Sequence, residues 1–170
     1  MLKALTAPLC AIGLVALLAG ALPGTVSPAR AQYGEIIANS MRNCAPGSGP
    51  AVRVTIRGIK SSTGKIRLQS YRANKQDWLA KGRWINRIEV PARKGNMTFC
   101  VPLPAPGAYA IAARHDANNN NETDISKDGG AMSNNPSINI FNLGRPGIDK
   151  TRFSVGQGVK PMSITMLYFG

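Results

Sequence analysis

The stretch Val52-Arg-Val-Thr-Ile-Arg57 (VRVTIR) alternates strictly between branched apolar and polar side chains. A repeat of two places successive side chains on opposite faces of an extended chain, so it predicts a half-buried β-strand with a cationic outer face. Residues 61–64 have the composition of a tight turn, and Ile66 and Leu68 then alternate with polar residues in the same way. The two segments together predict a β-hairpin.

Further short segments with apolar alternation follow along the chain. They are residues 88–90, 97–101, 108–114, 138–141, 153–155 and 162–168. One short helical turn is expected at residues 74–82, with Trp78 and Leu79 as its packing residues. About seven short strands separated by turn signals, with almost no helix, favour a single all-β domain built as a β-sandwich.

The first residues have the pattern of a secretory signal peptide. Lys3 precedes an unbroken apolar run at residues 9–22, and Ala29-Arg30-Ala31 supplies the small-x-small site that a signal peptidase needs. An uncleaved anchor is the alternative, but the run is shorter than the ~20 residues that a spanning helix requires. We therefore expect cleavage after Ala31, a periplasmic or secreted protein, and no transmembrane segment in the mature chain.

Removal of residues 1–31 decides how the cysteines are interpreted. Cys10 leaves with the signal peptide, so only Cys44 and Cys100 remain. Two cysteines in an exported chain most simply form a disulfide, and two free buried thiols are the alternative. Residues 32–50 are polar and rich in Pro and Gly, so we expect an irregular N-terminal arm, pinned by this disulfide to a β-sandwich domain at residues 51–170.

The chain is strongly basic. Its formal net charge of +13 falls to +11 when Lys3 and Arg30 leave with the signal peptide. The residues that could form a positive surface are Arg53, Arg57, Arg67, Arg72, Arg83, Arg87, Arg93 and Lys94. Such a surface would attract an anionic envelope polymer or lipid. A solvated face that keeps edge strands from pairing is the alternative. Export and a shortage of stacking aromatics argue against a nucleic-acid partner.

Residues 116–128 gather carboxylate and carboxamide side chains. Oxygen-bearing side chains occupy every second position, at Asp116, Asn118, Asn120, Glu122 and Asp124. This spacing is typical of loops that bind a hard cation, in which positions one, three and five converge and a backbone carbonyl at position seven adds a ligand. The interpretation makes Ca²⁺ the one candidate cofactor, with Glu122 offering its carbonyl and Asp124 binding directly or through water.

The match to an EF-hand loop is incomplete. Asn121 stands where Gly is usual, and Lys127 stands where a bidentate carboxylate is needed, with Asp128 one residue later. Any calcium affinity is therefore expected at the weak, extracellular end of the range. The alternative is an Asx-rich turn whose side chains cap their own backbone amides.

The single histidine, His115, directly precedes Asp116. Adjacent strand residues point to opposite faces, so the two side chains are not expected to pair as a base and its orienting acid. No Ser or Cys nucleophile lies beside them in a recognisable motif. We therefore expect a structural histidine and no catalytic residue. A hydrolase that uses the His115/Asp116 loop is the alternative.

Three motifs in the second half of the chain resemble a known family. They are Pro-Gly-x-Tyr-Ala at residues 106–110, His-Asp-x-Asn-x-Asn at 115–120 and Ser-Asn-Asn at 133–135. Together they resemble the exported bacterial family catalogued as domain of unknown function 2141, over about Val52 to Phe169. The resemblance implies a periplasmic or secreted Greek-key-type β-sandwich, immunoglobulin-like or prealbumin-like. It implies no established activity.

The sequence thus predicts a non-catalytic exported β-sandwich that serves as a binding or accessory module of the cell envelope. Weak calcium binding is the candidate property of its 116–128 loop. Its partner would be an anionic envelope polymer or another envelope protein. A binder of anionic polymer or lipid through a basic face, and a hydrolase, are the alternative functions.

Overall fold

The computed structural model of the chain describes residues 33–139, 142 and 144–170. The expected signal peptide, its cleavage site and Cys10 lie outside these residues. No helix within the described ranges is long and apolar enough to cross a membrane.

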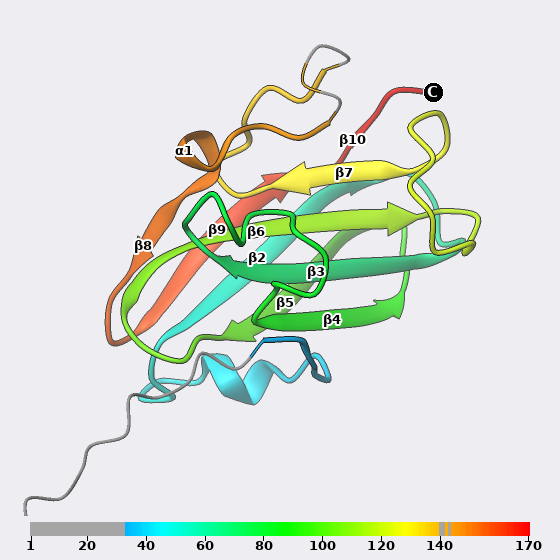
Figure 1. Cartoon of the computed structure of the whole chain (residues 1–170). Helices are drawn as coiled ribbons and strands as arrows, with labels where there is room; N and C mark the ends of the chain where they lie inside the picture. Colours follow the sequence, from blue (N-terminus) through cyan, green and yellow to red (C-terminus); the bar gives the residue numbers. More distant parts are fainter. Residues whose placement is uncertain (1–32, 140–141, 143) are drawn as a thin grey trace, which may run out of the picture. The chain divides into compact units, whose positions relative to one another are not determined.

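The domain consists of two β-sheets (Figure 1). The large sheet contains, in spatial order, β1 (Glu35–Ile36), β4 (Asn86–Pro91), β3 (Lys65–Arg72), β6 (Gly107–Asp116), β7 (Gly129–Met132) and β10 (Leu167–Tyr168), and β8 (Phe153–Val155) pairs with the start of β6. The small sheet contains β5 (Gly95–Pro102), β2 (Ala51–Ile59) and β9 (Val159–Thr165). Two helical elements, each a single turn, lie wholly within the described residues: η1 (Met41–Cys44) and α1 (Ile148–Thr151).

The core lies between the two sheets, and the alternation of the sequence explains why. Val52, Val54 and Ile56 of β2 are fully buried, while the intervening Arg53 and Arg57 are exposed. Ile66 and Leu68 of β3 are buried in the same cluster, together with Phe99 of β5 and Ile111 of β6. These side chains come from both sheets, so the prediction of an all-β sandwich is confirmed.

The predicted hairpin between β2 and β3 is wrong. β2 pairs with β5 and, in parallel, with β9, whereas β3 pairs with β4 and β6 in the other sheet. The register of β2 shifts between Ile56 and Ile59, and Gly58 there has a φ of 76°, which only Gly adopts without strain. After the bulge Ile59 still pairs with Gly95 of β5, and the chain passes into the large sheet through residues 60–64.

The strands expected at residues 88–90, 97–101, 108–114 and 153–155 appear with small changes of length, as β4, β5, β6 and β8. The single strand expected at residues 162–168 is divided between β9 and β10, which lie in different sheets. Two further strands were not expected. β1 and β7 were missed, while residues 138 and 139 are not in a strand and residues 140 and 141 lie outside the described part of the chain. The helical turn expected at residues 74–82 is a series of turns, in which the amide of Trp78 donates to the carbonyl of Asn74. The turns of η1 and α1 were not predicted.

Two loops cover part of the outer face of the large sheet. The indole Nε1 of Trp78 donates to the carbonyl of Pro146 at 2.7 Å, and Nη2 of Arg145 donates to the carbonyl of Leu79 at 3.2 Å. Trp78 also packs edge-on against Tyr71 of β3, with ring centroids 5.4 Å apart. These contacts hold the loop at residues 73–85 against residues 144–147 above the sheet.

The first of these loops is built around the buried carboxylate of Asp77. It accepts hydrogen bonds from Asn74 Nδ2 (2.9 Å), Tyr33 Oη (2.7 Å) and Arg83 Nε (2.7 Å). Burial acts to raise the pKa of Asp77, but these hydrogen bonds and the Arg83 charge outweigh it and leave the pKa below its ordinary 3.8. The loop is therefore most stable when Asp77 is ionised.

The expected disulfide is present and joins Cys44 at the end of η1 to Cys100 of β5, with Cα atoms 5.8 Å apart. It attaches the N-terminal arm to the small sheet. The arm also adds β1 to the edge of the large sheet through parallel pairing with β4, so the arm is less irregular than expected.

Candidate functional site

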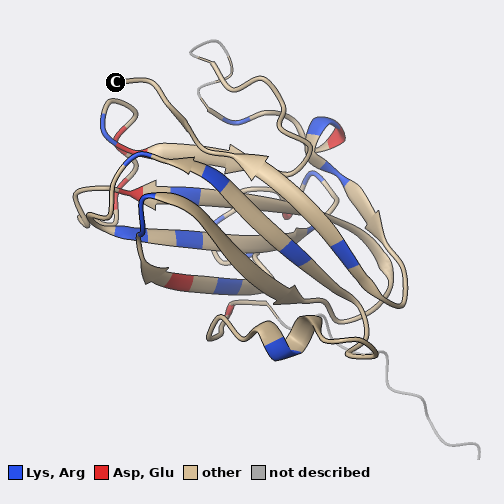
Figure 2. Ribbon diagram, turned by 180° about the vertical axis from the view of Figure 1, so that it is seen from behind, with Lys and Arg blue, Asp and Glu red and all other residues tan. Residues whose placement is uncertain are grey.

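The basic residues that the sequence singled out do not form one surface. Figure 2 shows Lys and Arg spread over strands of both sheets. Arg53 and Arg57 project from the outer face of the small sheet, because their neighbours in β2 fill the core. Arg67 and Arg87 project from the outer face of the large sheet. The placement of β2 and β3 in different sheets therefore divides the predicted basic face between opposite sides of the sandwich.

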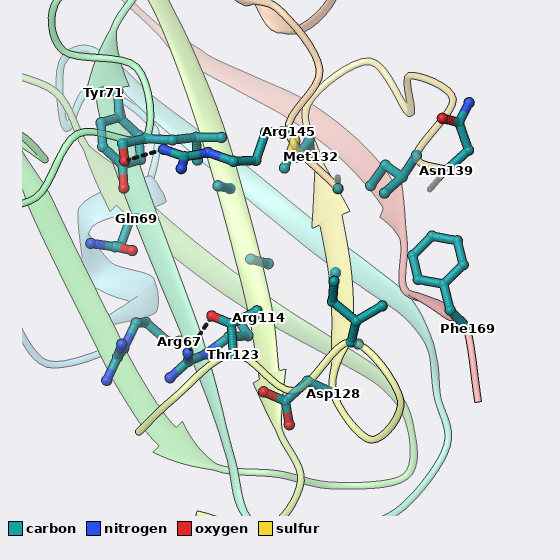
Figure 3. Close-up of a pocket in the computed structure, with 18 residues that line it drawn as sticks. Arg67, Gln69, Tyr71, Arg114, Thr123, Asp128, Met132, Asn139, Arg145 and Phe169 are labelled. Carbon is teal, nitrogen blue, oxygen red and sulfur yellow. Dashed lines mark hydrogen bonds between the residues drawn. The ribbon is translucent and has the colours of Figure 1, made fainter. Parts of the chain in front are cut away.

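A cavity of about 610 Å³ lies on the outer face of the large sheet, beside the two covering loops (Figure 3). Its floor comes from three neighbouring strands, which supply Arg67 and Gln69 of β3, Ala112 and Arg114 of β6, and Gly130 and Met132 of β7. The register sets two rows across the floor. Arg67 lies opposite Arg114, which lies opposite Gly130, and Gln69, Ala112 and Met132 form the next row.

The walls of the cavity are largely apolar. Ile125 comes from the 116–128 loop, Leu79 and Ile138 from the covering loops, and Phe169 from the C-terminal segment. Ile125 and Phe169 remain 54% and 45% exposed, although they are among the larger apolar side chains of the domain. Figure 3 places Arg67, Arg114 and Thr123 at one end of the cavity and Arg145 near Tyr71 at the other.

Arg67 and Arg114 are a like-charge pair on adjacent strands, and each side chain is only 16% exposed. Directly opposed like charges destabilise a sheet unless an opposite charge compensates. Nε of Arg67 donates to Glu89 Oε1 at 2.5 Å, but Glu89 also lies 3.7 Å from Arg87 and 3.8 Å from Lys65. The carboxylate of Glu89 is therefore shared by three cationic side chains.

Arg114 has a weaker acidic partner. Its Nη2 lies 3.4 Å from Asp116 Oδ2, and its buried Nε has no hydrogen-bond partner in the described part of the chain. Arg145, at the other end, makes no ion pair within the described residues. The only acidic residue of the cavity lining is Asp128, and both its oxygens accept backbone amides, those of Ala117 and Asp124. The cavity thus combines three arginines with little free negative charge.

Two pKa shifts reflect the burial of groups on this face. Burial, followed by the positive charge of Arg67, lowers the pKa of Arg87 below its ordinary 12.5. Burial raises the pKa of Tyr71, at the cavity edge, to about 12, although the charges of Arg87, Arg67 and Arg145 act to lower it. The Tyr71 hydroxyl therefore keeps its proton at neutral pH and remains a hydrogen-bond donor.

The 116–128 loop forms one wall of the cavity, and it brings together part of the predicted cation site. Oδ1 of Asn118 accepts from the amide of Asn120 at 3.3 Å, and Oδ1 of Asn120 accepts from the amide of Glu122 at 2.9 Å. Both carboxamides also donate to Asp124 Oδ2, at 2.6 and 2.9 Å. Asn121 has a φ of 67°, the left-handed conformation for which Gly is usual in cation-binding loops. The side chain of Glu122 is exposed.

Asp116 is fully buried at the start of this loop. Its Oδ2 accepts from the amide of Asn121 at 3.0 Å and faces Lys65 Nζ at 3.9 Å, while its Oδ1 has no hydrogen-bond partner among the described residues. Within the same residues no three His, Cys, Asp or Glu side chains are grouped closely enough to hold a metal ion. The calcium site stays a prediction, in a loop whose Asx turns satisfy much of its own backbone.

The loop is attached to the cavity arginines through Asn121 and Thr123. Arg114 donates to Thr123 Oγ1 at 2.8 Å and to the carbonyl of Asn121 at 3.0 Å, and Arg67 donates to Asn121 Oδ1 at 3.4 Å. Two of the three cavity arginines therefore hold the loop in place.

His115 lies on the opposite face of β6 from Arg114 and is fully buried. Its Nε2 lies 2.8 Å from the carbonyl of Thr63, and its Nδ1 lies 2.6 Å from the hydroxyl of Tyr168. A carbonyl can only accept, so Nε2 carries the proton and Nδ1 accepts from Tyr168. The imidazole ties β6 to β10 and to the turn before β3.

Sequence reasoning singled out Arg67 but not its role, and it missed Arg114, Gly130 and Arg145. Arg114 closes an alternating segment, so its outward direction could have been inferred. Gly130 lies in a strand without β-branched residues, and Arg145 lies in a loop; neither position carries a local pattern.

A family model described as "Uncharacterized protein conserved in bacteria (DUF2141)" matches residues 54–163, from within β2 into β9. The chain belongs to this family. The part of the DUF2141 domain that matches includes the three strands of the cavity floor and the 116–128 loop. No curated protein and no solved structure matches the chain.

Proposed function

We propose that this DUF2141 domain is a non-catalytic, exported binding module of the cell envelope that holds an anionic group in the cavity of its large sheet. The observation that carries the proposal is the opposed pair Arg67 and Arg114, largely buried on the cavity floor and sharing their acidic partners with other cations. A bound anion would relieve the repulsion between the two side chains.

The chemistry of arginine fits this role. Its planar guanidinium presents several donors in a fork that matches carboxylate and phosphate oxygens. Arg145 adds a third guanidinium, and the hydroxyls of Tyr71 and Thr123 line the same cavity.

The polar groups that line the cavity suit the binding of an anion. They include three guanidinium groups and the hydroxyls of Tyr71 and Thr123. His115 uses both ring nitrogens in structural hydrogen bonds on the other face of β6.

Calorimetric titration of the mature domain with inorganic phosphate at low ionic strength tests the proposal. Replacing Arg114 with Gln removes a charge-assisted contact, so we expect affinity to fall roughly tenfold to hundredfold. Arg145→Gln tests the other end of the cavity, and its melting temperature is measured beside its affinity because Arg145 also donates to the carbonyl of Leu79. Arg57→Gln on the small sheet is the matched control and should change nothing.

Two results would contradict the proposal. The absence of any phosphate binding by the wild-type domain is the first. An equal loss in the Arg57 and Arg114 variants is the second, because it would favour diffuse attraction of an anionic polymer over both faces.

The 116–128 loop supports a second candidate function, weak calcium binding. The specific observation is the buried Oδ1 of Asp116, which has no hydrogen-bond partner among the described residues. Asp116 begins the loop in which the carboxamides of Asn118 and Asn120 converge on Asp124. Lys65 and Arg114 face the same carboxylate and would lower the affinity for a cation.

Calcium titration of the mature domain tests this second function, with an expected dissociation constant of about 10⁻⁴–10⁻³ M. Asp124→Asn should abolish the heat of binding, and Asp149→Asn, in α1, is the control. No heat and no rise in melting temperature with millimolar calcium would contradict it.

A further inference from the structure

We propose that the ligand of the cavity is an anionic amphiphile, a carboxylate or phosphate head group carried on an apolar chain. This inference rests on the proposed anion-binding function and adds the class of ligand. It follows from the distribution of polar and apolar side chains around the cavity, from two exposed apolar side chains at its rim, and from the position of Gly130.

The polar groups are concentrated at the ends of the cavity. Arg67, Arg114 and Thr123 lie together at one end, where a head group would meet two guanidinium groups and a hydroxyl (Figure 3). The buried Nε of Arg114, which has no partner in the described structure, is an N–H donor at this end. Unpaired buried donors are rare, and each calls for a specific explanation.

The rest of the lining is mainly apolar, with the carboxamides of Gln69 and Asn139 as its polar exceptions. Ala112 and Met132 continue the floor in the row of Gln69, Gly130 lies beside Arg114 in the row of the proposed head group, and Ile138 and Leu79 stand around them. Ile125 and Phe169, 54% and 45% exposed, extend this apolar surface to the solvent. An inorganic anion would leave these side chains uncovered, whereas an apolar chain would cover them.

Gly130 shows that the space above the floor is open. A Cβ atom built on Gly130 meets nothing within 4 Å, and its φ is not in the left-handed region. The neighbouring Gly129 differs, because a Cβ there would lie 2.6 Å from Tyr168 and 2.7 Å from Met166. Packing therefore explains Gly129 but not Gly130. Glycine inside a strand weakens the strand and often marks the close approach of a ligand.

The volume agrees with this class of ligand. A cavity of about 610 Å³ falls within the range of small-molecule sites, which are mostly apolar with a few placed polar groups. A single alkyl chain with one head group fits this description better than a bulky polymer does.

Calorimetry with a graded series of ligands on the mature domain tests the inference. The series is acetate, hexanoate, decanoate, decyl phosphate and the neutral decanol, all below their aggregation concentrations. Affinity should rise about fourfold for each methylene that enters the cavity. Decanol should bind at least tenfold more weakly than decanoate, because it lacks the charge.

Gly130→Val places a side chain in the cavity without changing any charge. We expect it to weaken decanoate at least tenfold and to leave inorganic phosphate unchanged. Gly156→Val is the matched control, because a Cβ at Gly156 also meets nothing within 4 Å and that residue is away from the cavity. Phe169→Ser probes the exposed rim, where the fold is not at risk, and should weaken decanoate but not phosphate.

The possible results separate this inference from the function on which it rests. Equal affinity for acetate and decanoate, with phosphate binding that depends on Arg114, overturns the amphiphile and leaves the anion site. Decanol that binds as tightly as decanoate overturns the role of the head group. No binding by any anion overturns both. Preference for decyl phosphate or for decanoate identifies the head group.

Discussion

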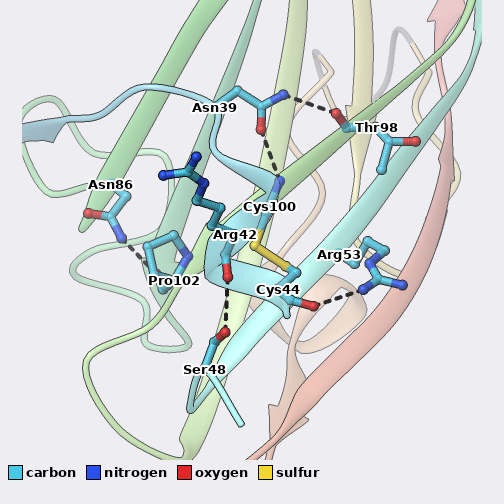
Figure 4. The surroundings of a disulfide bond; sticks show 9 residues. All are labelled: Asn39, Arg42, Cys44, Ser48, Arg53, Asn86, Thr98, Cys100 and Pro102. Carbon is cyan, nitrogen blue, oxygen red and sulfur yellow. Dashed lines mark hydrogen bonds between the residues drawn. A yellow bond between two sulfur atoms is a disulfide. The ribbon is translucent and has the colours of Figure 1, made fainter. Parts of the chain in front are cut away.

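Removal of the Cys44–Cys100 disulfide should destabilise the domain without unfolding it (Figure 4). The bond spans 56 positions of sequence, so the chain-entropy relation gives a stabilisation of about 4 kcal/mol. The arm keeps other attachments to β5, because Asn39 accepts from the amide of Cys100 at 3.1 Å and donates to the carbonyl of Thr98 at 3.0 Å. We therefore expect the loss to stay near the entropic value.

The corresponding change in melting temperature follows from the size of the domain. An unfolding entropy of about 2.1 cal/mol/K per residue gives about 0.3 kcal/mol/K for the 139 residues from Gln32. A loss of about 4 kcal/mol then lowers the melting temperature by about 14 °C.

Urea and thermal unfolding, followed by circular dichroism, measure this effect. The samples are the wild-type mature domain, the same protein in reducing agent, and the Cys44→Ala/Cys100→Ala double variant. Asn39→Ala, which keeps the disulfide, is the control and should lose about 1 kcal/mol. A loss below about 1 kcal/mol in both disulfide-free samples would refute the reasoning, because closure of so long a loop could not then be the main effect.

Three further predictions concern the contribution of single residues to stability. Gly64→Ala should lower the free energy of unfolding in urea by at least about 3 kcal/mol, because a Cβ there would lie 1.9 Å from the backbone oxygen of Asp116. Gly82→Ala has a similar φ but open space, so it should lower the free energy of unfolding by only about 1–2 kcal/mol. Equal losses in the two variants would contradict this reasoning. Tyr168→Phe leaves the buried Nδ1 of His115 without a donor and should cost about 1–3 kcal/mol, and unchanged stability would show that water replaces the hydroxyl. Because the pKa of Asp77 is lowered in the folded state, its carboxylate stabilises the domain fully above the unfolded-state pKa and loses this effect as the pH falls through the folded-state pKa. The free energy of unfolding should therefore depend less on pH between pH 5 and about 2 in Asp77→Asn than in the wild type. The same pH dependence in both proteins would contradict this prediction.

Alternation in the sequence was sufficient to find most strands, because one face of each sheet packs into the core and the other meets solvent. It could not find which strands pair. The parallel contact of β2 with β9 joins segments about a hundred residues apart, and β2 and β3, although consecutive along the chain, lie in different sheets. β7 was missed because Gly129 and Gly130 carry no side chain from which a pattern could be recognised.

The candidate site was harder to predict than the fold. The spacing of Asp116, Asn118 and Asn120 indicated a tight loop, and the Asx turns agree with that prediction. No local pattern indicated that Arg67 and Arg114 would lie beside this loop, since they are neighbours only through strand pairing. Strand register decides which charges on two strands lie opposite each other, and the register depends on the packing of the whole core.

A crystal structure of the mature domain with decanoate tests the central claim most directly. We expect the carboxylate within hydrogen-bonding distance of the Arg67 and Arg114 guanidinium groups, and the alkyl chain over Gly130 towards Phe169. A cavity that stays empty at saturating decanoate, or decanoate bound instead on the small sheet near Arg57, would contradict the account.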